Sequence, residues 1–266
     1  MCIRDRFEHI DCKLDNPILA DLRVRRALLH GVDRGKILRD LFGAQQAVAH
    51  SWLPPRRPEH NPAVHRYDFD PQRAAELLAE AGWRLAATGL REKDGQQLRL
   101  SITAPSGNST RERIEQQLQQ AWAKLGVQLD IENQPPTLFF QETLRERKFT
   151  GLAMYAWALD PLSDSGDLWR CDRIPTQENG LRGQNYPGWC NQEVTGLHQD
   201  IAHEFDPERR KALLMRQQLL WAEALPVLPL YFKVEPSITV KRLRGWKPTG
   251  SAMPISWNAA QWRYSN

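Results

Sequence analysis

One acidic side chain stands directly after a strongly apolar segment of the chain. The segment Gly151–Leu159 (GLAMYAWAL) is typical of a buried β-strand, and Asp160 follows it. Because α/β folds bind their ligands at the carboxyl ends of strands, we expect the Asp160 carboxylate to face a ligand crevice and to bind a cationic group there. Asp164 and Asp167 are rivals for that role. In the alternative interpretation, Asp160 only caps the turn ahead of Pro161.

Aromatic and amide side chains accompany this carboxylate. Tyr155 and Trp157 have the same parity in the strand, so they share one of its faces. They are either walls of a binding pocket, where strand backbone near Ala158 would pair with an extended ligand, or part of a hydrophobic core. Asn185 and Tyr186 follow a long polar loop and are candidates to reach the same crevice. The alternative for them is a turn with Tyr186 packed beneath it.

The chain carries none of the short motifs that mark common enzyme sites. It has no G-x-S-x-G nucleophile elbow, no phosphate-binding G-x-x-x-x-G-K-[ST], no G-x-G-x-x-G and no H-E-x-x-H. His9 and Cys12 supply two candidate metal ligands without a second pair, which argues against a zinc site. We therefore expect a protein that is not an enzyme and that uses no cofactor and no metal. A carboxylate-based hydrolase is the alternative.

Composition narrows the possible classes of protein further. A hydrophobic fraction of 41% with 10 Trp among 266 residues indicates a globular protein, and no apolar run approaches the roughly 18–20 residues of a membrane helix. The formal net charge of +4 comes from residues 233–266, which hold six basic residues and one acid. The rest of the chain is close to neutral, with arginines and acids interspersed. This distribution argues against a nucleic-acid partner, which requires a concentrated basic face.

The remaining sequence alternates between strand and helix patterns. Asp21, Asp33 and Asp70 are predicted N-caps of three helices, and Gly43 and Gly82 end the second and the third. Further helices are predicted over residues 108–126, 192–203 and 207–224, and further strands over residues 7–14, 97–103, 127–132, 226–234 and 237–241. Strand–helix–strand alternation predicts an α/β fold with parallel strand pairing.

Four segments in a fixed order carry a resemblance to a known family. They are DLRVRRALLHGVDRGKIL, FDPQRAAELLAEAGW, NYPGWCNQEV and RRKALLMRQQLLWAEALPVLPLYF. In this order they resemble the solute-binding proteins of the oligopeptide, dipeptide and nickel ABC importers. The resemblance extends over nearly all of residues 7–246 and matches the second large lobe of such proteins together with their closing tail.

This resemblance implies a fold and a domain organisation. The fold is a two-lobed periplasmic-binding-protein fold of the type II-like, peptide-binding group, with the first lobe largely missing. Residues 7–14 are then a crossover strand, residues 15–232 the second lobe, and residues 233–266 a tail that returns to the first lobe. Residues 1–6 (MCIRDR) lack the apolar region of a secretory signal, and we predict them to be a non-native leader.

The resemblance also implies a function. A peptide, or a related amine-bearing solute, binds between the lobes, the lobes close on it by a hinge motion, and the closed monomer delivers it to membrane permease subunits. The expected location is periplasmic or extracytoplasmic, with a lipid anchor as one form of the full-length protein. The rival interpretation is a cytoplasmic transcriptional regulator that uses the same lobe as its ligand sensor.

Individual residues take roles from the same resemblance. In the peptide-binding relatives, an acid three residues after a Trp anchors the α-ammonium group of the ligand, and Trp157 and Asp160 stand at that spacing. Some dipeptide-binding relatives carry a disulfide where this chain has Cys171 and Cys190, which would close a polar loop. The alternative is two unrelated free thiols. Cys12, inside the first strand, is expected to serve packing.

Overall fold

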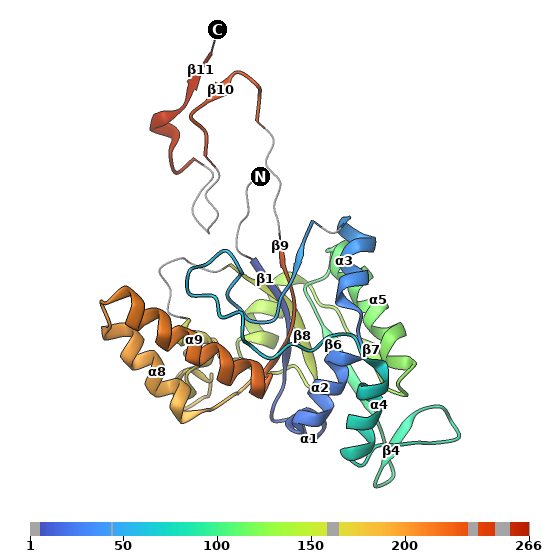
Figure 1. The fold of residues 1–266 in the computed structure, drawn as a ribbon. Coiled ribbons are helices and arrows are strands. Elements are labelled where there is room, and N and C mark those ends of the chain that lie inside the picture. Colours follow the sequence, from blue (N-terminus) through green and yellow to red (C-terminus); the bar gives the residue numbers. More distant parts are fainter. Residues whose placement is uncertain (1–5, 44, 159–164, 234–238, 248–255, 266) are drawn as a thin grey trace.

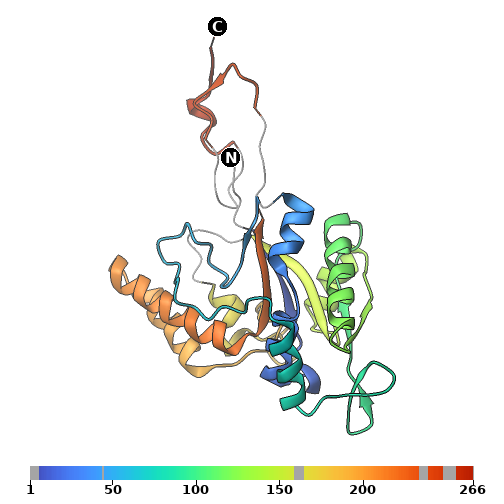
Figure 2. The same ribbon diagram turned by 45° about the vertical axis from the view of Figure 1, so that its right-hand side comes forward.

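The fold is organised around one mixed β-sheet of six strands. The computed structural model describes residues 6–43, 45–158, 165–233, 239–247 and 256–265 of the chain. Within these residues the strand order is β2-β9-β1-β8-β6-β7. The strands are β1 (Arg6–Cys12), β2 (Ala47–Val48), β6 (Arg99–Thr103), β7 (Gln128–Ile131), β8 (Leu152–Ala158) and β9 (Val227–Lys233). Helices cover both faces of this sheet, as Figures 1 and 2 show.

Only half of the sheet has the parallel pairing that the sequence predicts. The strand β6 runs parallel to its neighbours β7 and β8. The strand β1 lies between β8 and β9 and is antiparallel to both, and β2 is antiparallel to β9. The α/β class and the presence of parallel pairs are therefore confirmed, whereas the antiparallel pairs of β1, β2 and β9 were not predicted. The reason is that β1 pairs with strands about 145 and 220 residues further along the chain, and local periodicity carries no information on such distant partners.

The predicted helices are confirmed, and their caps explain where they begin. Asp21, Asp33 and Asp70 accept hydrogen bonds from the backbone N–H groups of the first turns of α2, α3 and α4. Gly43 ends α3 in the left-handed region, at φ 61°. The bounds are α2 (Leu22–His30), α3 (Arg34–Phe42), α4 (Pro71–Glu80), α5 (Ser109–Ala123), α8 (Gln192–His203) and α9 (Pro207–Ala224).

Several short elements complete the fold. They are α1 (Pro17–Ala20), α6 (Pro136–Leu138), α7 (Gly166–Trp169), the π-helical turn Phe139–Leu144, and the 3₁₀ turns Cys171–Arg173 and Ala259–Gln261. A small sheet of β3 (Arg84–Leu85), β4 (Arg91–Lys93) and β5 (Gln96–Gln97) was not expected from the sequence. In the described part of the chain, no helix has the length and apolarity that a membrane span requires.

Two apolar cores lie on opposite faces of the sheet. The helices α2 to α5 pack on the face that presents Ile10, Cys12 and Met154. The helices α7, α8 and α9 cover the other face, where Trp52, Trp169, Trp221, Phe7 and Phe232 pack together. Because side chains alternate along a strand, Ile10 and Met154 face the first core, whereas Phe7 faces the second, and Ala153 and Tyr155 belong to a third, smaller cluster.

The C-terminal residues form a separate small unit. The strands β10 (Leu243–Arg244) and β11 (Arg263–Tyr264) pair with each other. They lie well away from the six-stranded sheet, beyond the end at which β9 leaves it (Figure 1). The strand predicted over residues 237–241 is wrong for residues 239–241, which have no strand structure, and its first two residues lie outside the described part. Arg6, which the sequence assigns to the leader, is the first residue of β1.

Candidate functional site

The predicted site residues gather where β8 reaches the end of the sheet. Leu152 to Tyr155 are buried, Trp157 is partly exposed and Ala158 is exposed, so β8 runs from the core to the surface. Trp157 faces the same side as Tyr155, as their parity predicts. Asp160 and its rival Asp164 lie outside the described residues. The other rival, Asp167, forms an ion pair with Arg173, with 3.2 Å between Oδ1 and Nε.

Aromatic rings from three segments meet at this end of β8. The ring of Trp157 stacks on that of Tyr186, with 6.0 Å between centroids and 12° between planes. Tyr155 lies beneath them, 5.4 Å from Trp157 and 6.4 Å from Tyr186. Phe139 and Phe140 of the π-helical turn approach Tyr155 from the side, at 6.0 and 6.3 Å. We call the rings of Phe140, which is exposed, Trp157, which is partly exposed, and Tyr186, which is buried, the aromatic face.

Beyond Ala153 one edge of β8 is open. Its pairing with β6 ends at the pair Thr103 and Ala153, whereas its pairing with β1 continues to Ala158. Among the described residues, no other strand pairs with the outer edge of residues 154–158. Backbone N–H and C=O groups along such an edge can pair with an added extended chain.

A buried polar cluster supports the aromatic face from below. The Tyr155 hydroxyl donates to Oδ2 of Asp11 at 2.6 Å, and Nε2 of His9 lies 3.2 Å from Oδ1 of the same carboxylate. Nδ1 of His9 lies 3.1 Å from the carbonyl oxygen of Phe7. Because a carbonyl only accepts, the contact with Phe7 is a hydrogen bond in the tautomer that carries its hydrogen on Nδ1.

Both tyrosines of the site have raised pKa values. Burial is the main cause for Tyr155, whose pKa lies well above its usual range, and the nearby Asp11 carboxylate adds to the effect. Burial, with the charge of Asp11 second, raises the pKa of Tyr186 to about 12. Both phenols therefore remain neutral at physiological pH, as hydrogen-bond donors and apolar ring surfaces.

Asn185 lies in the same region but is directed inward. Its side chain is fully buried; Nδ2 donates to the carbonyls of Arg170 and Trp189 at 3.0 and 2.7 Å, and Oδ1 accepts from the Trp189 N–H at 3.1 Å. These bonds hold the loop that presents Tyr186. The geometry thus agrees with the alternative in which residues 185–186 form a structural turn, and a ligand contact of Asn185 remains a prediction.

A disulfide closes the same loop. Cys171 and Cys190 are bonded, with their Cα atoms 4.5 Å apart and Asn185 and Tyr186 inside the loop they close. Cys12 is buried, and desolvation raises the pKa of its thiol to about 12, which leaves little thiolate and suits a packing role. The described residues contain no group of three or more His, Cys, Asp and Glu side chains arranged to hold a metal ion.

Sequence reasoning missed four contributors to the site. Phe139 and Phe140 lie on a π-helical turn, and their pairing in the sequence was the only signal. His9 and Asp11 occupy inward-facing positions of β1, opposite Tyr155 and Ala153 of β8. Polar residues at alternate positions of a buried strand indicate a polar cluster in the core, and that signal was present in the FEHIDC segment.

Curated relatives are peptide-binding proteins. The chain is 25% identical to the oligopeptide-binding protein AppA of Bacillus subtilis over 249 residues, which is 91% of this chain and 44% of the relative. It is 26% identical to the dipeptide-binding protein of Escherichia coli over 219 residues, which is 79% of this chain and 37% of the relative. The chain therefore spans less than half the length of these relatives.

Solved structures share the fold, and a family model matches most of the chain. The oligopeptide-binding protein of Thermus thermophilus, solved with a pentapeptide, superposes with a TM-score of 0.88 at 34% identity, over 99% of this chain and 48% of that one. The NikZ protein of Campylobacter jejuni, solved with Ni(L-His), has a TM-score of 0.82 at 23% identity, over 98% of this chain and 52% of that one. The model of the bacterial extracellular solute-binding proteins, family 5 (middle region), matches residues 4–174. The chain belongs to this family of extracellular solute-binding proteins.

Proposed function

We propose that this chain forms part of the substrate-binding component of an ABC importer, and that it captures a peptide or a related amine-bearing solute. The observation that carries the proposal is the aromatic face beside an open strand edge at the end of β8. The partly exposed ring of Trp157, stacked on the buried ring of Tyr186, offers an apolar wall, and the free edge of residues 154–158 offers backbone hydrogen bonds. Together these features suit an extended peptide. The names of the relatives support a binding protein and favour neither the regulator nor the hydrolase.

Each predicted site residue has a part in this proposal. Asp160, two residues beyond the last residue of β8, would bind the α-ammonium group of the ligand by a charge-assisted hydrogen bond. Trp157 and Tyr186 would contact its side chains, and the backbone at Ala158 would pair with its backbone. Tyr155 and Asn185, both buried, would hold the rings and the loop in place.

The proposed domain organisation assigns the sheet and its helices to one lobe of a two-lobed clamp. In this proposal residues 7–14 cross into the lobe, residues 15–232 form it, and residues 233–266 return to the other lobe. Exposed Trp257 and Tyr264 in the separate C-terminal unit support a packing partner outside the described residues, because large exposed apolar side chains commonly mark interaction surfaces.

Delivery then follows from closure of the clamp. A ligand that contacts both lobes binds the closed form more tightly, so it shifts the open–closed equilibrium, and the closed monomer would dock on the permease. The bonded Cys171 and Cys190 suit an oxidising compartment, which supports a periplasmic or extracytoplasmic location, with or without a lipid anchor.

A peptide screen tests the proposal. The intact gene product would be incubated with a library of di- to pentapeptides and analysed by native mass spectrometry, beside Asp160→Ala and the rival Asp167→Ala. We expect peptides to be retained intact by the wild type and by Asp167→Ala, and to be lost by Asp160→Ala. A folded wild type that retains no peptide would contradict the proposal, and loss in Asp167→Ala alone would move the anchor to Asp167.

A further inference from the structure

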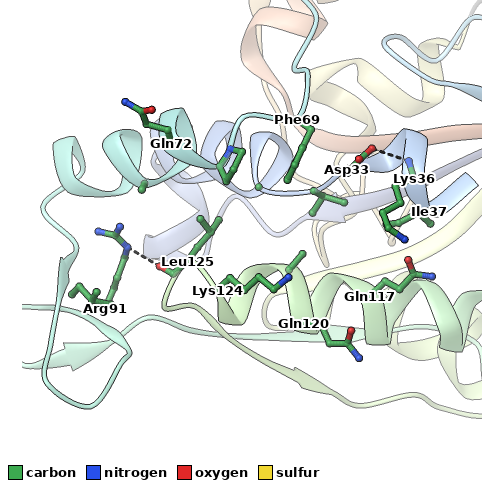
Figure 3. A pocket seen from close by; sticks show the side chains of 16 residues that line it. Asp33, Lys36, Ile37, Phe69, Gln72, Arg91, Gln117, Gln120, Lys124 and Leu125 are labelled. Atoms are coloured by element: carbon green, nitrogen blue, oxygen red, sulfur yellow. Dashed lines mark hydrogen bonds between the residues drawn. The ribbon is translucent and has the colours of Figure 1, made fainter.

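A cavity lies on the opposite side of the sheet from the aromatic face. It has a volume of about 590 Å³, within the range of small-molecule sites, and lies between the start of α3, the start of α4 and the second half of α5 (Figure 3). We call it the helical pocket. Its lining residues are Gly31, Val32, Asp33, Lys36, Ile37, Phe69, Pro71, Gln72, Ala75, Leu85, Arg91, Gln117, Gln120, Ala121, Lys124 and Leu125.

The helical pocket has an unusually exposed apolar wall. Phe69 and Leu85 are 51% and 64% exposed, and both line this one cavity although they come from different segments. Val32, Ile37 and Leu125 form further apolar lining. Since leaving large apolar side chains in water is unfavourable by about 25 cal/mol for each Å² that could be buried, two such side chains at one cavity indicate an apolar occupant.

The charges around the pocket are predominantly positive and incompletely paired. In Figure 3, Lys124 lies between Arg91 at one end and Lys36 at the other. Lys36 pairs with Asp40, and Oδ1 of Asp33 accepts the backbone N–H of Lys36 at 2.7 Å to cap α3. Within the described residues, neither Lys124 nor Arg91 has a carboxylate in ion-pair contact.

Arg91 adds a fixed positive charge to one end of the pocket. It is 8% exposed, and its Nε and Nη1 donate to the carbonyls of Leu125 and Trp83, both at 2.8 Å. Carbonyl oxygens orient the guanidinium but do not neutralise it, and desolvation lowers its pKa accordingly. An anionic group near this end would supply the missing countercharge.

Close backbone packing keeps the pocket walls in place. A Cβ atom at Gly31 would lie 2.4 Å from Cδ1 of Leu125, so the turn between α2 and α3 approaches α5 as closely as a glycine allows. The backbone N–H of Arg91 donates to the carbonyl of Gly126 at 2.7 Å, which fixes the small sheet against the end of α5. The cavity walls therefore rest on a main-chain hydrogen bond and on the buried Leu125 side chain, which packs against Gly31.

From these observations we propose that the helical pocket binds a small anionic amphiphile, with its apolar body against Phe69 and Leu85 and its acidic head between Lys124 and Arg91. The carboxylate or sulfonate head compensates the unpaired positive charge, and the apolar body covers the exposed wall. This site is separate from the aromatic face and does not rest on the proposed peptide-binding function.

The proposal is tested with 1-anilinonaphthalene-8-sulfonate, an apolar monoanion, titrated into the intact protein while its fluorescence is followed. We expect saturable binding at one site. Phe69→Ser should weaken it about tenfold by removing apolar contact, and Lys124→Glu about fivefold by reversing a charge at the rim. The matched controls Phe205→Ser, at a side chain 91% exposed between α8 and α9, and Lys211→Glu on α9 should bind like the wild type.

A pair of competitors tests the charge of the head group separately. Decanoate should displace the probe, whereas decyltrimethylammonium, with the same alkyl chain and the opposite charge, should not. Both pocket variants change exposed side chains, so unfolding curves should match that of the wild type and show that the fold is retained. The absence of saturable binding, equal affinity in all four variants, or equal displacement by the two competitors would each overturn the proposal.

Discussion

The aromatic face and the helical pocket lie on opposite faces of one sheet and are built in different ways. The aromatic face stands on a central strand, with Tyr155 held from below by Asp11 and its neighbouring loop closed by a disulfide. The helical pocket lies between helix ends; its Lys36 and Lys124 side chains are long and exposed, whereas Arg91 is buried. A ligand at the first meets a preorganised surface, whereas a ligand at the second must also order the exposed Lys124.

The largest expected effect is on the buried cluster beneath the aromatic face. Asp11→Ala leaves the Tyr155 hydroxyl and His9 without their carboxylate partner in the core, so we expect the free energy of unfolding to fall by about 4 kcal/mol. Urea unfolding measures this loss. The control Asp40→Ala, which removes an exposed partner of Lys36 beside the helical pocket, should change it by less than about 0.5 kcal/mol. Similar losses of unfolding free energy in Asp11→Ala and Asp40→Ala would contradict the claim that a buried polar cluster supports the aromatic face more strongly than exposed charges support the helical pocket.

Removal of the disulfide should affect one region and spare the other. The double variant Cys171→Ala/Cys190→Ala opens a loop with a sequence separation of 19, for which chain entropy predicts a loss of about 3 kcal/mol. Because the loop carries Tyr186, peptide retention should fall, while binding of the sulfonate probe at the helical pocket should persist. The single variant Cys12→Ala serves as the control for thiol removal. Equal weakening of both ligands would show that the disulfide supports the whole fold and not this face.

A buried acid on α5, Glu115, should make the free energy of unfolding depend on pH. Glu115 is fully buried, its Oε2 accepts from Asn133 at 2.7 Å, and burial raises its pKa to about 7 from 4.5. The folded protein therefore binds the Glu115 proton more tightly than the unfolded chain does. The stability that this proton contributes is fully present below pH 4.5 and is lost as the pH rises to about 7. We expect Glu115→Gln to flatten the stability profile over this window by about 2 kcal/mol, measured by urea unfolding at several pH values.

The Gln variant must be compared with a change at an exposed acid away from Glu115. Glu76→Gln on α4 provides this control, and its profile should keep the wild-type slope between pH 4.5 and 7. If Glu115→Gln keeps the wild-type slope between pH 4.5 and 7, the buried carboxyl does not titrate there and the assignment fails.

The smallest expected effect comes from removal of a single hydroxyl group, that of Tyr155. Tyr155→Phe keeps the ring contacts with Trp157 and Tyr186 and removes only the hydrogen bond to Asp11, so a loss of about 1 kcal/mol in the free energy of unfolding is expected. Thermal unfolding resolves a change of this size. No change relative to Tyr186→Phe would mean that the bond contributes nothing to the support of the aromatic face.

Local sequence signals predicted the helices and the strand beneath the site well. Asp70 followed by Pro71 marked the start of α4, and the parity of Tyr155 and Trp157 placed both rings on one side of β8. These features depend on neighbouring residues, whose relative positions are set by helix and strand geometry.

Features that join distant segments were not predicted. The bond from Tyr155 to Asp11 spans 144 positions, and nothing in either segment identifies the other. The helical pocket likewise combines Ile37, Phe69 and Lys124, which meet only because α3, α4 and α5 pack on the same side of the sheet. Antiparallel insertion of β1 between β8 and β9 has the same origin.

The most direct test of the central claim, that the aromatic face is where ligand binds, is a calorimetric titration of the intact protein with a peptide that it retains, together with Trp157→Ala and Phe69→Ser. We expect Trp157→Ala to weaken peptide binding at least about tenfold, because it removes one of the stacked rings, and Phe69→Ser to leave the affinity unchanged. Unchanged affinity in Trp157→Ala, or a loss confined to Phe69→Ser, would contradict the account.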